Sequence, residues 1–141
     1  MNDQALLEEI YQNARTGIYA IETMMPRVDD GGIRLVLEGQ RQKMADISHN
    51  AREMARLRGL DLPDAPARDK MGIWAGTRMN TLLDSTPSHL ADMVIQGDTM
   101  GITKMVGVLN DAQDADVDIV GLGTQLVNTQ RRAIECLKNF L

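Results

Sequence analysis

The chain has 141 residues, which is enough for one domain with a substantial hydrophobic core. Apolar residues make up 43% of the chain but aromatic residues only 3%, so Leu, Ile, Val, Ala and Met have to form that core. The net charge of −5 argues against a sequence-independent nucleic-acid binder, which would need a basic face, and it does not suit attraction to anionic lipid.

The single cysteine and the polar N-terminus indicate a reducing compartment. Cys136 cannot form an internal disulfide, and it lies late in a predicted helix with no histidine nearby in the sequence, so we interpret it as an inert thiol. No apolar run approaches the roughly 18 residues of a membrane span, and the N-terminal stretch MNDQALLEE does not resemble a signal peptide. We therefore expect a cytoplasmic protein with neither nucleic acid nor membrane as a partner.

Two long helices are predicted in the first half of the chain. The first covers residues 3–25, with Asn2 or Asp3 as its cap, and the second begins after Asp29 or Asp30 and runs about 28 residues. Both show apolar side chains at spacings of three and four, which indicates one buried face. These stripes are Leu7, Ile10, Ala14, Gly17, Ile18, Ile21 and Met25 in the first helix, and Ile33, Leu37, Gln40, Met44, Ile47, Ala51 and Met54 in the second.

A long connection follows. Gly59 suits a left-handed helix stop, and residues 60–68 are predicted to form a loop because they contain two prolines and two aspartates. Residues 69–84 are predicted to form a short helix. Thr86 and Pro87 then have the order expected of a helix cap and a first helical residue.

Two further long helices are predicted over residues 87–110 and 116–140, with Asp114 or Asp116 capping the last one. The third long helix is apolar over a wide arc, so we expect it to contact the core on one side and the short helix or another subunit on the other. Its two stripes are Leu90, Val94, Gly97, Gly101, Met105 and Val108, and Ile95, Ile102, Val106 and Leu109. The last helix has one face with Ile119, Gly123, Leu126, Gln130, Ile134, Leu137 and Leu141.

These elements predict an all-α protein, with residues 1–141 forming a single four-helix-bundle domain. The short connections at 26–30 and 111–115 make each pair of long helices an antiparallel hairpin. The connection between the pairs, with its short fifth helix, is long enough to run the length of the bundle. Two hairpins joined by one long crossover form the ferritin-like topology.

Two segments add a family resemblance. Met79–Leu82 (MNTL) and Ser88–Gly97 (SHLADMVIQG), together with the helix layout, resemble a group of small bacterial ferritin-like proteins of uncharacterised function. The resemblance covers most of the chain and implies the ferritin-like fold. Its motifs carry no known chemistry, so it implies no activity.

A standard di-iron centre is not predicted. Ferritin-like di-iron proteins use a Glu-x-x-His pair on each of two helices, and none of the six glutamates here has a histidine three residues later. Asp46 and His49 have a similar spacing, but His49 is predicted to point away from the core stripe. The alternative is an atypical site for Fe, Mn or Zn formed by His89, Asp92 and Glu22.

A buried polar layer is also predicted. Counting equal depths along the four helices places Gln40, Gln96 and Gln130 at one level, with Gly17 leaving room on the fourth side. Buried amides have to find hydrogen-bond partners. The layer is interpreted either as structural or as an altered site that holds a water, a small ligand or an ion.

No nucleophile, acid–base pair or phosphate loop is identified in the sequence, so no catalytic residue is assigned. The leading hypothesis is a non-enzymatic bundle that acts by self-association, as a homodimer, or by binding an unidentified protein partner. The alternative is a metal- or small-ligand-binding relative of the di-iron carboxylate proteins, with its site near His89, Glu22 and Asp92.

Overall fold

The computed structural model describes residues 1–63, 78 and 83–141. These ranges contain four long α-helices and no β-strand, which confirms the predicted all-α class. The helices are α1 (Asp3–Met24), α2 (Gly31–Leu57), α4 (Pro87–Asp111) and α5 (Val117–Leu137), with short 3₁₀ helices η1 (Met25–Arg27) and η2 (Lys138–Phe140) after α1 and α5. The short helix predicted over residues 69–84 falls almost entirely outside the described ranges.

Each long helix begins at a side-chain cap. Asn2 accepts a hydrogen bond from the backbone N–H of Ala5 at 2.8 Å, and the other three caps are Asp30, Thr86 and Asp116. These side chains satisfy backbone donors that the first helical turn leaves without an internal partner. Gly59, just past the end of α2, has the left-handed φ of 66° expected of a helix stop. The caps explain why the helix starts are close to those predicted.

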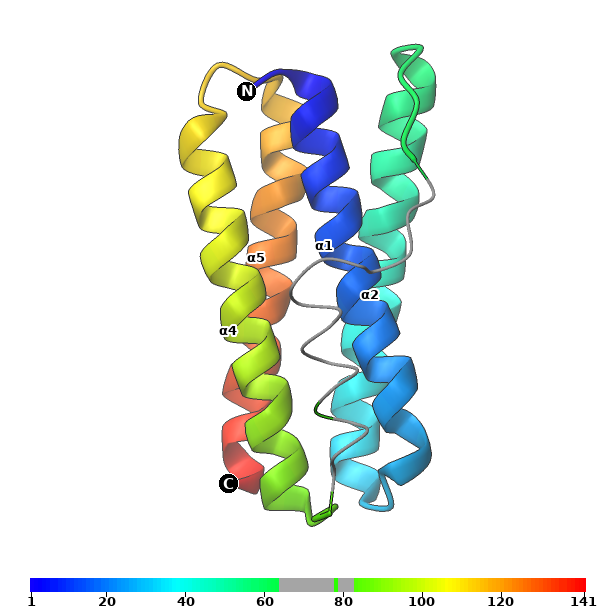
Figure 1. Ribbon diagram of the computed structural model, residues 1–141, viewed down its shortest axis with the longest axis vertical. Coiled ribbons are helices and arrows are strands. Elements are labelled where there is room, and N and C mark those ends of the chain that lie inside the picture. Colours follow the sequence, from blue (N-terminus) through cyan, green and yellow to red (C-terminus); the bar gives the residue numbers. More distant parts are fainter. Residues whose placement is uncertain (64–77, 79–82) are drawn as a thin grey trace.

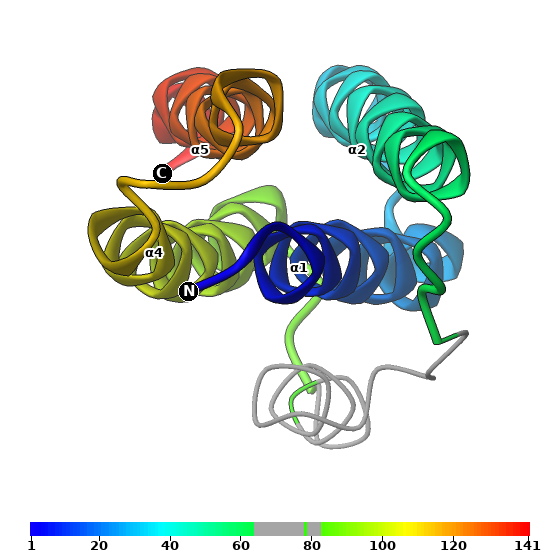
Figure 2. The same cartoon turned by 90° about the horizontal axis from the view of Figure 1, so that it is seen from above.

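The four helices stand at the corners of a bundle. Figure 1 shows α1 and α2 as one antiparallel hairpin and α4 and α5 as another, and α2 ends at the opposite end of the bundle from the start of α4. Seen from above, α1 neighbours α2 and α4, while α5 lies diagonally across from α1 and α2 lies diagonally across from α4 (Figure 2). The two hairpins therefore pack side by side, with α1 against α4 and α2 against α5.

The core runs along the bundle axis and contains most of the predicted stripes. Its fully buried large apolar side chains are Leu6, Leu7, Ile10, Ile33, Leu37, Met44, Leu90, Met105, Ile119, Leu126 and Leu137. The second stripe of α4 is only partly buried, but Leu109 packs against α5, where a β-carbon at Gly123 would lie 2.8 Å from its Cδ2. The wide apolar arc of α4 is thus explained in part by contact with both α1 and α5.

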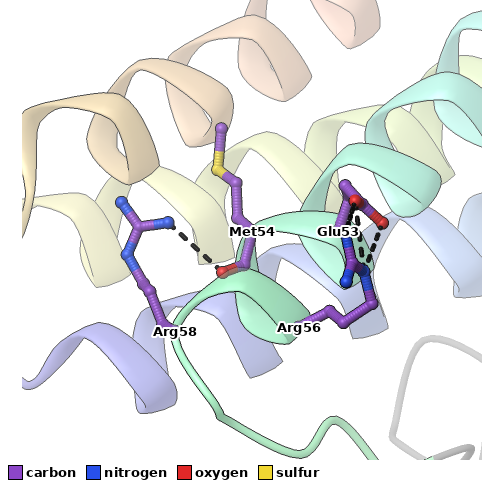
Figure 3. A network of polar contacts seen from close by, with 4 residues as sticks. All are labelled: Glu53, Met54, Arg56 and Arg58. Atoms are coloured by element: carbon purple, nitrogen blue, oxygen red, sulfur yellow. Dashed lines mark hydrogen bonds and ion pairs between the residues drawn. The ribbon is translucent and has the colours of Figure 1, made fainter.

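Polar contacts surround the C-terminal end of α2 and link it to the start of α5. Figure 3 shows the ion pair of Arg56 with Glu53 and the hydrogen bond from Arg58 Nη1 to the Met54 carbonyl, 3.2 Å long. Arg58 also pairs with Asp116 Oδ2 at 3.1 Å, which links α2 to the start of α5. This network is partly exposed, and its Met54 packs against the edge of the core. None of the described helices combines the length and apolarity needed to cross a membrane.

Candidate functional site

Seven polar or charged side chains are buried among the described residues, and five of them lie near one level of the bundle, with at least one from every long helix. The exposed fractions of these five are 3% for Asn13, 2% for Thr16, 5% for Gln40, 6% for Asp98 and 2% for Gln130. We call these five residues the polar layer. Two other buried polar residues, Ser48 and Thr129, bond back to carbonyls of their own helices and do not join it.

Two hydrogen-bonded bridges in the polar layer cross the diagonals of the bundle. Gln40 Nε2, on α2, donates to Asp98 Oδ1 on α4 at 2.6 Å. Gln130 Nε2, on α5, donates to Asn13 Oδ1 on α1 at 2.9 Å, and Asn13 Nδ2 donates to the Gly101 carbonyl at 3.0 Å. Asp98 and Gly101 are three residues apart on α4, so the two bridges lie on adjacent turns of the bundle.

Glycine makes the second bridge fit. A β-carbon at Gly101 would collide with Nε2 of Gln130 and lie 3.4 Å from Oδ1 of Asn13. On α1, a β-carbon at Gly17 would lie 2.6 Å from the sulfur of Met44. The absence of a side chain at these two positions therefore lets neighbouring helices and the buried amide of Gln130 approach closely.

Asp98 is the one carboxyl group of the polar layer. Burial raises the pKa of Asp98 to about 8, and the hydrogen bond from Gln40 opposes this only in part. The group is therefore mostly protonated and neutral at pH 7. A carboxyl held neutral in a hydrophobic interior is typical of functional sites, because environments that shift a pKa this far also tune binding and proton transfer.

A pocket of about 50 Å³ adjoins this carboxyl group between α1 and α4. Its polar lining residues in the described part of the chain are Gln40, Asp98 and Arg78, and its other lining residues are Gly17, Ala20, Ile21, Met24, Met93, Val94 and Gly97. At roughly 10–15 Å³ for one water, the pocket has room for about three to five water molecules. It is therefore an apolar-walled pocket with a few polar groups, as small-molecule sites generally are.

Several oxygen atoms of the polar layer have no hydrogen-bond partner among the described residues. They are Gln40 Oε1, Asp98 Oδ2, Thr16 Oγ1 and Gln130 Oε1, and all four are buried. Each such atom costs on the order of 1–3 kcal/mol when it lacks a partner. Gln40 and Asp98 also contribute to the lining of the pocket, although these two oxygen atoms are themselves buried.

The residues predicted as an atypical metal site do not come together. His89 lies half-buried in the first turn of α4, and Asp92 accepts a hydrogen bond from Gln96 Nε2 at 2.9 Å. Glu22 is exposed on α1 and lines a surface hollow that also includes Arg34. Across the described ranges no group of three or more His, Cys, Asp or Glu side chains is arranged to hold a metal ion. The polar layer, with one carboxyl and three amides, does not fit a di-iron centre either.

The predicted glutamine layer and the observed polar layer share Gln40 and Gln130 but not Gln96. Gln40 and Gln130 are buried in it, but Gln96 is only half-buried, where it accepts a hydrogen bond from Arg78 Nη2 at 3.0 Å. Asp98 occupies the place expected of Gln96. The signal for Asp98 was its position four residues after Val94 and three before Gly101, which continues the core spacing of α4.

Asn13 and Thr16 were also missed. Asn13 follows Ile10 by three residues and precedes Gly17 by four, so it shares the spacing of the first helix's stripe. Thr16 lies one turn after Asn13, on the same side of the helix. A stripe defined by apolar residues alone passes over both of them.

Comparison with known proteins finds similar folds but indicates no activity. No family model matches the chain, and no curated protein matches it. The fold is similar to that of a conserved hypothetical protein, rv2844, from Mycobacterium tuberculosis, with a TM-score of 0.73 and 14% identity over 99% of this chain and 96% of that one. It is also similar to a DUF305 fragment from Deinococcus radiodurans, with a TM-score of 0.73 and 14% identity over 97% and 93% of the two chains. Neither name states an activity, so this likeness concerns the fold alone.

Proposed function

We propose that this protein is a non-enzymatic, ferritin-like helical bundle that binds a small molecule in the pocket between α1 and α4. One observation carries the proposal: two buried oxygens without partners among the described residues, Gln40 Oε1 and Asp98 Oδ2, belong to side chains that line an apolar-walled pocket. The ferritin-like topology is supported by the two antiparallel hairpins and by the opposite placement of the end of α2 and the start of α4 (Figure 1).

A purely structural role explains only half of the polar layer. The bridge from Gln130 through Asn13 to Gly101 uses neutral groups and suits a structural link. Asp98 is different, because an uncharged amide would serve the bond from Gln40 without a carboxyl group in the core. Burying an ionisable group carries a free-energy cost that a structural link does not require. A bound ligand would account for a carboxyl group at this buried position.

The test is an NMR titration of ¹⁵N-labelled protein with small molecules of two to four non-hydrogen atoms and different head groups. We expect at least one of them to shift the amide signals of Ala20, Gly97 and Asp98. Ala20→Leu places a larger side chain in the pocket and should abolish these shifts. Ala5→Leu, the same change on the same helix away from this pocket, is the control and should preserve them. The proposal fails if no head group binds, or if Ala20→Leu binds as well as the unsubstituted protein.

We also propose that copies of the chain associate through the outer stripe of α4, as the homo-oligomer prediction requires. Ile95, Ile102 and Val106 on this stripe are only half-buried within one chain, and exposed Thr99 and Thr103 lie between them. A second copy would complete their burial. Sedimentation velocity at micromolar concentration should detect a dimer that Ile102→Glu dissociates. A monomer over the whole concentration range would contradict self-association and would leave the ligand proposal untouched.

A further inference from the structure

We propose that Asp98 and Gln40 form a closed acid–amide pair, in which the carboxyl proton of Asp98 lies on Oδ2 and is donated to Gln40 Oε1. This proton acts as a latch that holds the α1–α2 hairpin against the α4–α5 hairpin until alkaline solution removes it. Such a latch goes beyond the proposed function and holds with or without a ligand in the pocket. Both oxygens that the proton joins are buried without a partner among the described residues, although Gln40 Nε2 and Asp98 Oδ1 are joined at 2.6 Å.

A single proton satisfies both oxygens. Ionised Asp98 offers only acceptors, so once Gln40 Nε2 donates to Oδ1, the two groups are left with two buried acceptors and no donor. Protonated Asp98 has an O–H donor, and Gln40 Oε1 is the remaining acceptor of the amide to which it is already bonded. The terminal torsions of Asp and Gln side chains are broad, so the two planar groups can align and close both bonds. The closed pair therefore accounts for both oxygens without another molecule.

The need for this proton does not depend on which way the Gln40 amide is turned. Turned over, the amide places its oxygen 2.6 Å from Asp98 Oδ1, a distance at which two oxygens need a proton between them. Its nitrogen then donates to Oδ2. In both orientations a neutral Asp98 makes two bonds with Gln40, whereas an ionised Asp98 makes one.

The helices packed around Asp98 favour its neutral form. Asp98 is 6% exposed, and burial raises the pKa of its carboxyl group to about 8. The residues that α1 contributes to the pocket lining and to the polar layer are all uncharged. On α2, Glu38 and Arg41 flank Gln40, and they form an ion pair with each other at 3.0 Å.

The remaining neighbours of Asp98 supply no countercharge either. On α5 the buried polar neighbour is Gln130, and the charged residues next to it in the chain, Arg131 and Arg132, are exposed. Arg78 is the cation of the described pocket lining, and its Nη2 donates to Gln96 Oε1 at 3.0 Å. The other titratable residues of α4, none of them buried, are His89, Asp92, Lys104 and Asp111. No described cation forms an ion pair with Asp98.

Loss of the proton opens the pair. Asp98 Oδ2 and Gln40 Oε1 are then two acceptors that repel each other, and one of the two bonds between α2 and α4 is lost. The pocket beside these side chains has room for water, which supplies the donors that the carboxylate needs. The bridge from Gln130 to Asn13 contains no titratable group and is unaffected. The hairpins therefore begin to separate at Asp98.

The first experiment follows the pair by NMR from pH 5 to pH 9.5 in protein labelled with ¹³C and ¹⁵N. At pH 6 we expect the Asp98 carboxyl carbon at the shift of a protonated acid, and a carboxyl proton signal with a nuclear Overhauser effect to the Gln40 side-chain amide. The Asp98 carbon and the Gln40 amide nitrogen should then titrate together, with a midpoint at about pH 8. An ionised Asp98 at pH 6, or a titration that leaves Gln40 unmoved, would overturn the proposal.

A matched pair of glutamine variants tests where the proton lies. Gln40→Met keeps the length of the side chain but removes both polar atoms, so the carboxyl proton signal should be lost through exchange with water. Gln42→Met, the same change at an exposed position of α2, should preserve the signal. A signal that persists in Gln40→Met would place the proton elsewhere and overturn the closed pair. The titration of the unsubstituted protein decides the question even if a variant does not fold.

The latch itself is tested by electron–electron resonance between spin labels on the two hairpins, at Lys43→Cys on α2 and Asn128→Cys on α5, with Cys136→Ser removing the exposed native thiol. A population with a longer distance should appear above about pH 8 and vanish on return to pH 6. Asp98→Asn, whose amide can make both bonds at every pH, should show no such population, whereas Asp46→Asn should behave like the unsubstituted protein. Unchanged distances up to pH 9.5, or separation in Asp98→Asn, would overturn the latch and leave the ligand proposal untouched.

Discussion

Replacing Asp98 with asparagine is predicted to stabilise the folded protein at neutral and alkaline pH and to change little in acid. Asparagine has the shape of a protonated aspartic acid, and its side-chain oxygen can still accept the hydrogen bond from Gln40 Nε2. Asparagine differs from aspartic acid in that its side chain does not gain or lose a proton. The prediction therefore isolates the cost of burying this one ionisable group and does not depend on any ligand.

The magnitude follows from the pKa of Asp98, which is about 8 in the folded chain against an ordinary value of 3.8. Below pH 3.8 the group is protonated in both the folded and the unfolded chain, so the stability linked to it is fully present. As the pH rises toward 8, the folded chain keeps a proton that the unfolded chain has lost, and the free energy of unfolding falls by about 1.4 kcal/mol per pH unit. The loss reaches about 4 kcal/mol at pH 7 and levels off above pH 8. Asp98→Asn should recover a stabilisation of this order.

The assay is urea unfolding monitored by circular dichroism at unit steps from pH 4 to pH 9, for the unsubstituted protein and Asp98→Asn. The difference between the two free energies of unfolding should be small at pH 4 and grow steadily to pH 8. Asp46→Asn makes the same change at an exposed carboxylate on α2, and this matched control tests whether the effect is specific to the buried position. Parallel curves for Asp98→Asn across this range would refute the reasoning, since they would mean that Asp98 ionises as easily in the core as in water.

Two further predictions, tested in the same urea assay, concern glycines and caps. Gly101→Ala should destabilise the bundle by about 1–3 kcal/mol, because the added carbon displaces the buried amide of Gln130. Gly107→Ala, on the same helix, should instead stabilise the bundle by up to about 1 kcal/mol, because a β-carbon there meets nothing within 4 Å. Asp30→Ala should cost about 1 kcal/mol because Asp30 caps α2, whereas Asp29→Ala should cost much less. Equal effects within either pair in the urea assay would contradict these assignments.

The helices could be predicted from the sequence because local chemistry specifies them. Asn2, Asp30, Thr86 and Asp116 cap the backbone donors beside them, and apolar residues at spacings of three and four mark the buried faces. Such signals involve residues that are close in the chain. These local signals do not depend on the tertiary structure of the rest of the chain.

The site depends on contacts between distant residues, and these are harder to read. Counting depth along straight helices reached Gln40 and Gln130, but on α4 it stopped two residues short, at Gln96 instead of Asp98. Acidic residues are rarely fully buried, so the residue type of Asp98 argues against a core position. The pocket could not be predicted, because it depends on the spacing of α1 and α4 and on where Arg78 reaches α4.

The two diagonal bridges also determine where the bundle is weakest at high pH. Each bridge joins a helix of the α1–α2 hairpin to a helix of the α4–α5 hairpin, so neither bridge exists until the hairpins dock. Each hairpin can form from contacts close in sequence, whereas docking buries Asp98 and, at neutral pH, takes up a proton from water. Alkaline solution therefore weakens the seam between the hairpins and leaves each hairpin's own contacts intact, and along this seam the molecule opens first.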